Sequence, residues 1–79
     1  MRNFYLLIKD NCPLCTVAIQ RIHEVALEEP VTLHMVDIAS QPELLEEYGN
    51  LVPVLVRERD DAEIKWPFAD DKLRIFLEQ

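Results

Sequence analysis

The fold of this chain is decided by residues 4–15, which read FYLLIKDNCPLC. The first five are apolar and strand-forming, which predicts a strand that is covered on both faces. A polar cluster follows, and Cys12-Pro13-Leu14-Cys15 then begins a segment of helical periodicity, with Pro13 suited to the first helical position. The two cysteines therefore lie where a strand gives way to a helix.

The segments that follow complete a strand–helix–strand unit. Apolar residues three and four positions apart predict a helix over residues 13–28. Its predicted buried face consists of Leu14, Ala18, Ile22, Val25 and Ala26. Residues 31–38 are rich in β-branched and apolar side chains and predict a second strand, which such a unit normally places parallel to the first.

The second half of the chain predicts helix, strand, strand and helix. Residues 40–43, SQPE, match a capping box, and Gly49 suits a left-handed end for that short helix. The apolar run of residues 51–56 predicts a strand, and the strand should begin at Pro53 because proline cannot donate a hydrogen bond to a neighbouring strand. Residues 63–66 are predicted to pair with it as a hairpin. A last helix is expected over residues 70–77, with Asp70 as N-cap and Asp71 in the first turn. Its apolar face is Leu73, Phe76 and Leu77.

Composition limits the classes of function. The chain has 79 residues, 49% of them hydrophobic, and a net charge of −7, which predicts one packed domain over residues 1–79. An acidic chain without a basic cluster is a poor binder of nucleic acid. The apolar runs are too short for a secretion signal or a membrane span, so we expect a soluble, cytoplasmic protein with no membrane partner.

The cysteine pair is the candidate reactive centre. Two cysteines are too few for the disulfide framework of a small secreted domain, and their spacing indicates a reactive or metal-binding pair. A free thiol has a pKa of about 8.5, and amides at a helix N-terminus lower it toward neutrality. Lys9 adds positive potential, which Asp10 opposes. We therefore expect Cys12 to attack a disulfide and the more buried Cys15 to resolve the product.

Two other readings of the pair stay open, namely half of a zinc site or an inert buried pair. Zinc needs four ligands, and the further candidates are His23 and His34, whose spacings match no common zinc site. We expect no metal site and assign both histidines to the surface or the edge of the core.

Lys9, Cys12-Pro13-Leu14-Cys15, Val52-Pro53 and the order βαβαββα together resemble a glutaredoxin, and specifically the short glutaredoxin-like proteins of the thioredoxin-fold superfamily. The resemblance covers nearly the whole chain. It implies an α/β thioredoxin-like fold with a four-stranded mixed sheet of order 2-1-3-4 and helices on both faces. It also implies a cis Val52–Pro53 bond facing the cysteines, with the Val52 amide and carbonyl turned outward to pair with an extended peptide or glutathione.

The same resemblance implies substrate-binding roles for Lys9, Pro13, Leu14, Val52 and Pro53, with Lys9 holding a glutathione carboxylate or steadying the thiolate. A solvated surface lysine is the alternative for Lys9. Many glutaredoxins have Tyr in place of Leu14, and a Gly-Gly-acidic cradle for glutathione where this chain has residues 66–70, WPFAD. Asp70 or Asp71 would replace that cradle or simply cap the helix. Trp66 and Phe68 would form an apolar lip or, as we favour, part of the core.

The resemblance implies a thiol–disulfide oxidoreductase that reduces disulfides or mixed disulfides of proteins or glutathione through Cys12 and Cys15. Glutathione is then a co-substrate, or a reductase protein supplies the electrons; no tightly bound cofactor and a monomeric state are expected. The alternatives are a non-catalytic binding module and a carrier that holds an iron–sulfur cluster across a dimer with glutathione.

Overall fold

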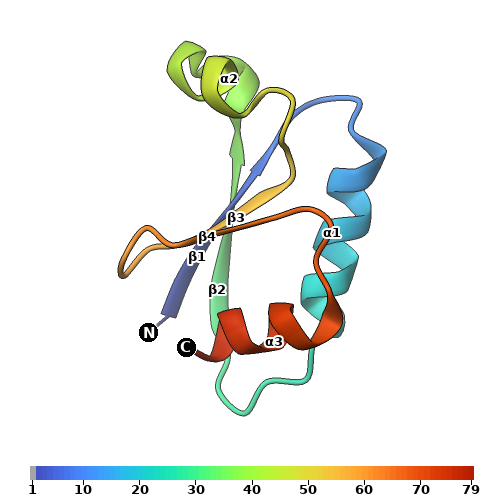
Figure 1. Ribbon diagram of the computed structural model, residues 1–79, viewed down its shortest axis with the longest axis vertical. Helices are drawn as coiled ribbons and strands as arrows, with labels where there is room; N and C mark the ends of the chain where they lie inside the picture. The colour runs from blue at the N-terminus through green and yellow to red at the C-terminus, as the bar shows by residue number, and fades with distance from the viewer. Residues whose placement is uncertain (1) are drawn as a thin grey trace.

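The computed structural model describes residues 2–79. Its elements (Figure 1) are β1 (Arg2–Ile8), α1 (Pro13–Glu24), β2 (Val31–Asp37), the 3-10 turn η1 (Ile38–Ser40), α2 (Pro42–Tyr48), β3 (Val54–Arg57), β4 (Glu63–Lys65) and α3 (Asp70–Glu78). The predicted element order is confirmed. Helix α1 ends at Glu24 rather than at residue 28, because Val25 and Leu27 pack against the core from an extended connection instead of from a further helical turn.

The sheet confirms the predicted order and directions. Its strands lie in the order β2-β1-β3-β4, with β1 parallel to β2 and antiparallel to β3. Leu7 on β1 is opposite Val54 on β3. If this register is continued beyond the ladder, Pro53 comes opposite Ile8 and Val52 opposite Lys9. The register therefore brings the Val52-Pro53 segment to the edge of the sheet from which the cysteine loop departs (Figure 1).

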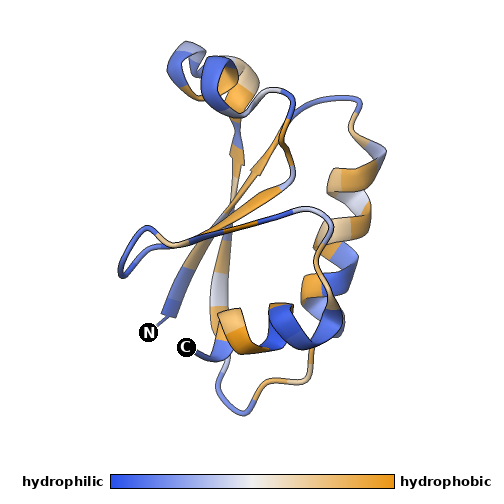
Figure 2. Cartoon of the chain, in the orientation of Figure 1, coloured by the Kyte–Doolittle hydropathy of each residue, from blue (hydrophilic) through white to orange (hydrophobic). Residues whose placement is uncertain are grey.

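Helices α1 and α3 cover one face of the sheet. Figure 2 shows the central strands as hydrophobic and the turn between β3 and β4 as hydrophilic. The larger core cluster contains Phe4, Leu6, Ala18, Ile22, Leu55, Phe68, Leu73 and Leu77. Phe76 is partly buried against it, so the apolar face predicted for the last helix is confirmed.

Helix α2 covers part of the other face. Leu7, Ile38 and Val54 form a smaller buried cluster there, against which Leu44 and Tyr48 of α2 pack. The Tyr48 hydroxyl also donates a hydrogen bond to Glu63 on β4, and this contact raises the pKa of Tyr48 to about 12. The expected placement of helices on both faces is therefore confirmed.

The capping box predicted for α2 is wrong. The N-cap is Gln41, and the Ser40 hydroxyl donates instead to the Asp37 carbonyl. Ser40 belongs instead to the preceding turn η1, whose N-cap Asp37 accepts a hydrogen bond from the Ala39 amide. Ser40 therefore lies one position before the N-cap of α2.

Gly49 ends α2, but not in the predicted left-handed conformation. Its φ is −52°, within the right-handed region. A Cβ at this position would lie 2.5 Å from the Leu45 carbonyl oxygen, which is closer than such atoms approach in proteins. Glycine is therefore required here by close packing of the backbone rather than by a positive φ.

Arg57 links the β3–β4 turn to α3 through hydrogen bonds. Its guanidinium makes two hydrogen bonds of 2.9 Å to the Asp60 carboxylate and one of 3.1 Å to the Phe76 carbonyl. It also lies 4.8 Å from the centre of the Phe76 ring. The bonds from Arg57, aided by the Ala62 amide, lower the pKa of Asp60 to about 2. One arginine thus joins the β3–β4 turn to the last turn of α3.

Membrane insertion can be assessed from the helices. Among residues 2–79, no helix has both the length and the apolar character that crossing a bilayer requires.

We expect Leu73→Ala to lower the free energy of unfolding by about 2–5 kcal/mol, because it leaves a cavity in a close-packed core. Leu73 is fully buried, whereas Ile75 on the same helix is 51% exposed. Ile75→Ala is the matched control and should change stability by no more than about 0.5 kcal/mol. Denaturant unfolding measures both values, and equal losses would contradict the assignment of the α3 face.

Asp60 should titrate near pH 2 in a carboxyl NMR titration, and Arg57→Met should raise its pKa toward the ordinary value, although the Ala62 amide still lowers it. Because the folded-state pKa is depressed, the Arg57–Asp60 pair stabilises the fold fully above the unfolded pKa. That contribution is lost as the pH falls from about 4 toward 2. An unchanged Asp60 titration in the Arg57→Met protein would disprove the pairing.

Candidate active site

Cys12 is the N-cap of α1, as the sequence predicts. Pro13 occupies the first helical position, and Cys15 lies in the first turn. The Cys15 amide donates to the Cys12 sulfur at 3.2 Å and to the Cys12 carbonyl at 3.1 Å. An N-cap oxygen normally accepts such a bond from an otherwise unpaired amide of the helix start. Here a sulfur atom has that role, so the helix end acts directly on the Cys12 side chain.

The two sulfurs are joined in a disulfide. The Cα atoms of Cys12 and Cys15 are 5.3 Å apart, within the range that a disulfide spans. Cys12 is half-buried, whereas Cys15 is only 4% exposed. A molecule approaching from solvent can reach the sulfur of Cys12 more easily than that of Cys15. The predicted difference in burial between the two cysteines is confirmed.

Asn11 positions the pair, and the sequence analysis missed it. Its φ is 57°, in the left-handed region. Asparagine tolerates this conformation better than most residues with a side chain. The turn lets the chain leave β1 and enter α1 with Cys12 at the N-cap. The Asp10-Asn11 dipeptide was the available signal, because both residue types favour turns.

The segment before β3 differs in part from expectation. The Val52–Pro53 bond is cis, which is the isomer that the resemblance implies, and so is Trp66–Pro67. Pro53 is buried, and its carbonyl accepts from the Trp66 amide at 3.2 Å. The Val52 amide, however, donates to the Tyr48 carbonyl at 3.1 Å. The expectation that this amide faces outward is therefore wrong.

Lys9 connects two parts of the site. Its side chain is half-buried, and Nζ donates a hydrogen bond to the Gly49 carbonyl. The bond ties the end of β1 to the loop that carries Val52 and Pro53. Lys9 is therefore hydrogen-bonded within the protein and is not the freely solvated surface lysine that was the alternative.

Leu14 is 47% exposed, so its predicted place on the buried face of α1 is wrong. The buried residues of this helix are Cys15, Ala18 and Ile22, a stripe that begins one position later. Ala26 is also exposed, because α1 has already ended before it. The error at Leu14 arises because Cys15, a small apolar residue in its own right, takes the inward position of the first turn.

Residues 66–70 are held against α1. Phe68 is buried, which confirms its core assignment, and Trp66 is partly buried against the same cluster. The guanidinium of Arg21 lies 5.8 Å from the Trp66 ring centre and donates to the Phe68 carbonyl at 3.2 Å. This arrangement fixes the segment that enters α3.

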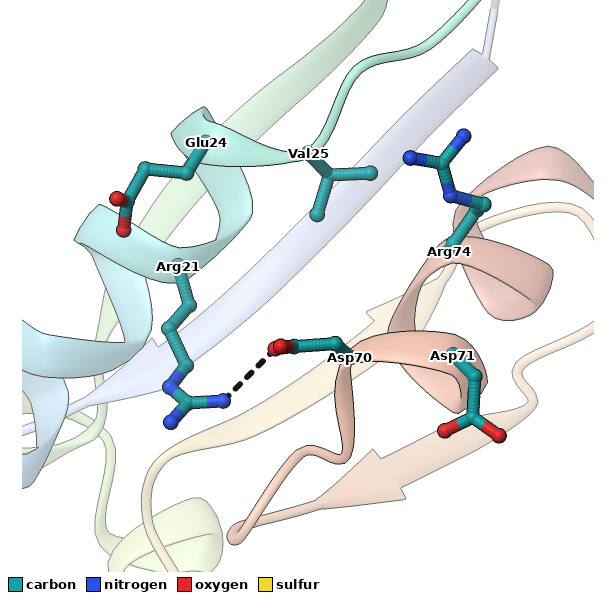
Figure 3. A pocket seen from close by; sticks show the side chains of 6 residues that line it. All are labelled: Arg21, Glu24, Val25, Asp70, Asp71 and Arg74. Atoms are coloured by element: carbon teal, nitrogen blue, oxygen red, sulfur yellow. Dashed lines mark hydrogen bonds and ion pairs between the residues drawn. The ribbon is translucent and has the colours of Figure 1, made fainter.

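Asp70 is not the N-cap of α3; that position is Ala69. Its carboxylate instead pairs with Arg21 at 2.9 Å, as Figure 3 shows. The pair borders a hollow of about 450 Å³ between α1 and α3, whose other lining residues are Glu24, Val25, Asp71 and Arg74. Asp70 is thus engaged by Arg21, on the third turn of a helix that begins at the cysteines.

The histidines are surface residues, as expected. Both are exposed, and His34 stacks on Tyr5 with ring centres 5.1 Å apart. Within residues 2–79, no three or more His, Cys, Asp or Glu side chains are grouped so that they could hold a metal ion.

Comparisons with known proteins place the chain in a family. Residues 3–78 match the family model of the glutaredoxin-like domain (DUF836). The X-ray structure of the structural genomics target protein XcR50 from X. campestris is 30% identical in sequence with a TM-score of 0.74, and the match covers 94% of this chain and 93% of that one. The solution structure of XcR50 gives a TM-score of 0.73, again at 30% identity, over 98% and 92% of the two chains.

A more distant structure shares the fold alone. The N-terminal domain of Synechococcus elongatus SasA is 23% identical with a TM-score of 0.58, and the match covers 96% of this chain and 75% of that one. No curated protein matches the chain. The family match and the XcR50 structures nevertheless agree with the observed fold. This chain is a member of the glutaredoxin-like domain family with a thioredoxin-like fold.

Proposed function

We propose that this protein is a thiol–disulfide oxidoreductase with Cys12 as the nucleophile and Cys15 as the resolving thiol. One observation carries the proposal, namely a disulfide between a half-buried cysteine at a helix N-cap and a nearly buried cysteine in the first turn of that helix. An inert structural pair would need neither accessibility nor contact with the helix end. Membership of a glutaredoxin-like family supports redox chemistry at this pair.

The exchange transfers two electrons. In the reduced protein the Cys12 thiolate attacks one sulfur of a substrate disulfide, forms a mixed disulfide and releases the other substrate sulfur as a thiolate, which takes a proton. Cys15 then loses its proton and attacks the Cys12 sulfur. The second substrate thiol is released, and the Cys12–Cys15 disulfide seen in the structure forms. The substrate is reduced, the protein is oxidised, and glutathione or a reductase protein would return the electrons.

The helix start favours the charged form of Cys12. The Cys15 amide already points at the Cys12 sulfur, and the dipole of α1 is positive at this end. Both effects are larger for a thiolate than for a neutral thiol, because charge-assisted hydrogen bonds are stronger. When Cys15 then attacks the Cys12 sulfur, the substrate thiolate is the leaving group, so a substrate thiol of lower pKa is released faster.

Cys12→Ser should abolish reduction of disulfides, because it removes the attacking sulfur. Cys15→Ser should retain the first step and accumulate a mixed disulfide on Cys12, detectable by mass spectrometry of the intact protein. Far-ultraviolet circular dichroism should show both variants folded. Normal turnover by a folded Cys12→Ser protein would contradict the assignment of the nucleophile.

The Cys15→Ser protein also isolates the Cys12 thiol for titration. Its thiolate absorbance should rise at a midpoint below the pKa of about 8.5 of an ordinary cysteine. The Cys12→Ser protein is the matched control, and the buried Cys15 should titrate at higher pH than Cys12 because burial disfavours the charged form. The reverse order of the two midpoints would show that Cys15, not Cys12, is the activated thiol.

A further inference from the structure

We infer that this disulfide centre acts on a protein segment with basic and apolar side chains beside its cysteine, in preference to glutathione. The inference rests on the proposed function and names the substrate class of the same site. It follows from three features around Cys12, namely the surplus of carboxylates, the engagement of the nearby cation, and the exposed apolar side chains.

The end of the molecule that carries Cys12 is acidic. It is formed by residues 9–17 after β1 and residues 37–53 between β2 and β3, which Figure 1 shows gathered beyond the same edge of the sheet. Five exposed carboxylates lie in these segments: Asp10, Asp37, Glu43, Glu46 and Glu47. Lys9 is the one basic residue within these two segments, and the exposed Lys65 of β4, opposite Val54, adds one more positive charge next to them. The five carboxylates therefore outnumber the two lysines. Summed charge of one sign raises the local concentration and association rate of an oppositely charged partner.

Lys9 is only partly available to a ligand. One of the three donors of its ammonium group is used by the Gly49 carbonyl, and its side chain is half-buried. Arg21, the next basic residue along the chain, is bonded to Asp70 and the Phe68 carbonyl.

Glutathione matches these surroundings poorly. Each glutathione carries two carboxylates and one ammonium group at neutral pH, so its disulfide is an anion. Carboxylates bound at a protein surface are normally met by arginine, lysine or several backbone amides. Here the Val52 amide is already used by the Tyr48 carbonyl. Association of an anionic disulfide with this acidic end is therefore slowed by repulsion.

The side chains that flank the site suit an apolar segment. Leu14, between the two cysteines, is 47% exposed, and Val17 one turn further along α1 is 38% exposed. Leu51, next to Val52, is 43% exposed. Such side chains gain from contact with apolar groups of a partner but give nothing to a carboxylate. The Val52 carbonyl can accept a backbone amide of an extended segment.

The test is a single-turnover reaction of the reduced protein with three disulfides, followed by acid quenching and mass spectrometry. The probes are glutathione disulfide and two peptide disulfides of equal length that have Leu beside Cys and either Lys or Glu at the flanks. Each rate is divided by the rate of the same probe with dithiothreitol, which removes differences in intrinsic reactivity. We expect the Lys peptide to react at least roughly tenfold faster than the other two at low ionic strength, and this ratio to fall when salt is added.

Charge-reversal variants show where the preference arises. Glu46→Lys/Glu47→Lys changes exposed residues of α2 within the acidic end, and we expect it to remove most of the preference for the Lys peptide. Glu28→Lys/Glu29→Lys makes the same change in net charge in the α1–β2 connection, at the opposite end of the sheet (Figure 1). This matched control should keep most of the preference. Replacing Leu by Ser in the Lys peptide should slow its reaction, because the peptide then loses its contact with the exposed apolar side chains beside Cys12. An unchanged rate would contradict the apolar part of the inference.

Two results would overturn the inference. If glutathione disulfide reacts as fast as the Lys peptide, or if the two charge-reversal variants behave alike, the acidic end does not select the substrate, while the proposed oxidoreductase activity stands. If none of the three probes reacts faster with the wild-type protein than with the Cys12→Ser protein, the proposed activity itself is wrong.

Discussion

The contact between the first turn of α1 and the sulfur of Cys12 is the interaction on which the rest of the site depends. The amides at a helix start have no partner within the helix, and at this helix one of them points at a sulfur. The contact needs β1 to end and α1 to begin within a few residues. Asn11, with its positive φ, makes that short connection. The reactivity proposed for the pair thus depends on how a strand is joined to a helix.

The sheet brings a second segment to this junction from about forty residues further along the chain. Antiparallel pairing of β3 with β1 fixes the register, so that the residues before β3 lie opposite the residues after β1. Lys9 then bonds to the Gly49 carbonyl, and Tyr48 holds the Val52 amide. These two hydrogen bonds hold the loop of residues 49–53 in place at the end of the sheet where the cysteine segment begins.

Three errors of sequence interpretation share one cause, which is competition between local motifs and their neighbours. Ser40 has the spacing of a capping residue, yet Asp37 forms an earlier turn and takes Ser40 into it. Asp70 has the composition of an N-cap, yet Arg21 on another element binds its carboxylate. Leu14 has the right hydrophobicity for the core, but Cys15 occupies the inward position of that turn. In each case the competing partner is a specific contact that spacing alone does not show.

The sequence by itself determined the order of the elements, the place of Cys12 at the helix start and the greater burial of Cys15. The order of the elements follows from hydrophobic periodicity, and the place of Cys12 follows from the preference of Pro13 for the first helical position. The burial of Cys15 follows from its three-residue offset from Cys12, which puts it in the first turn. Only the tertiary structure decided which polar groups remain free around the sulfur. The partners of Lys9, Val52 and Asp70 lie on segments that the folded sheet and helices bring near, and hydrogen bonds between distant segments depend on that final register.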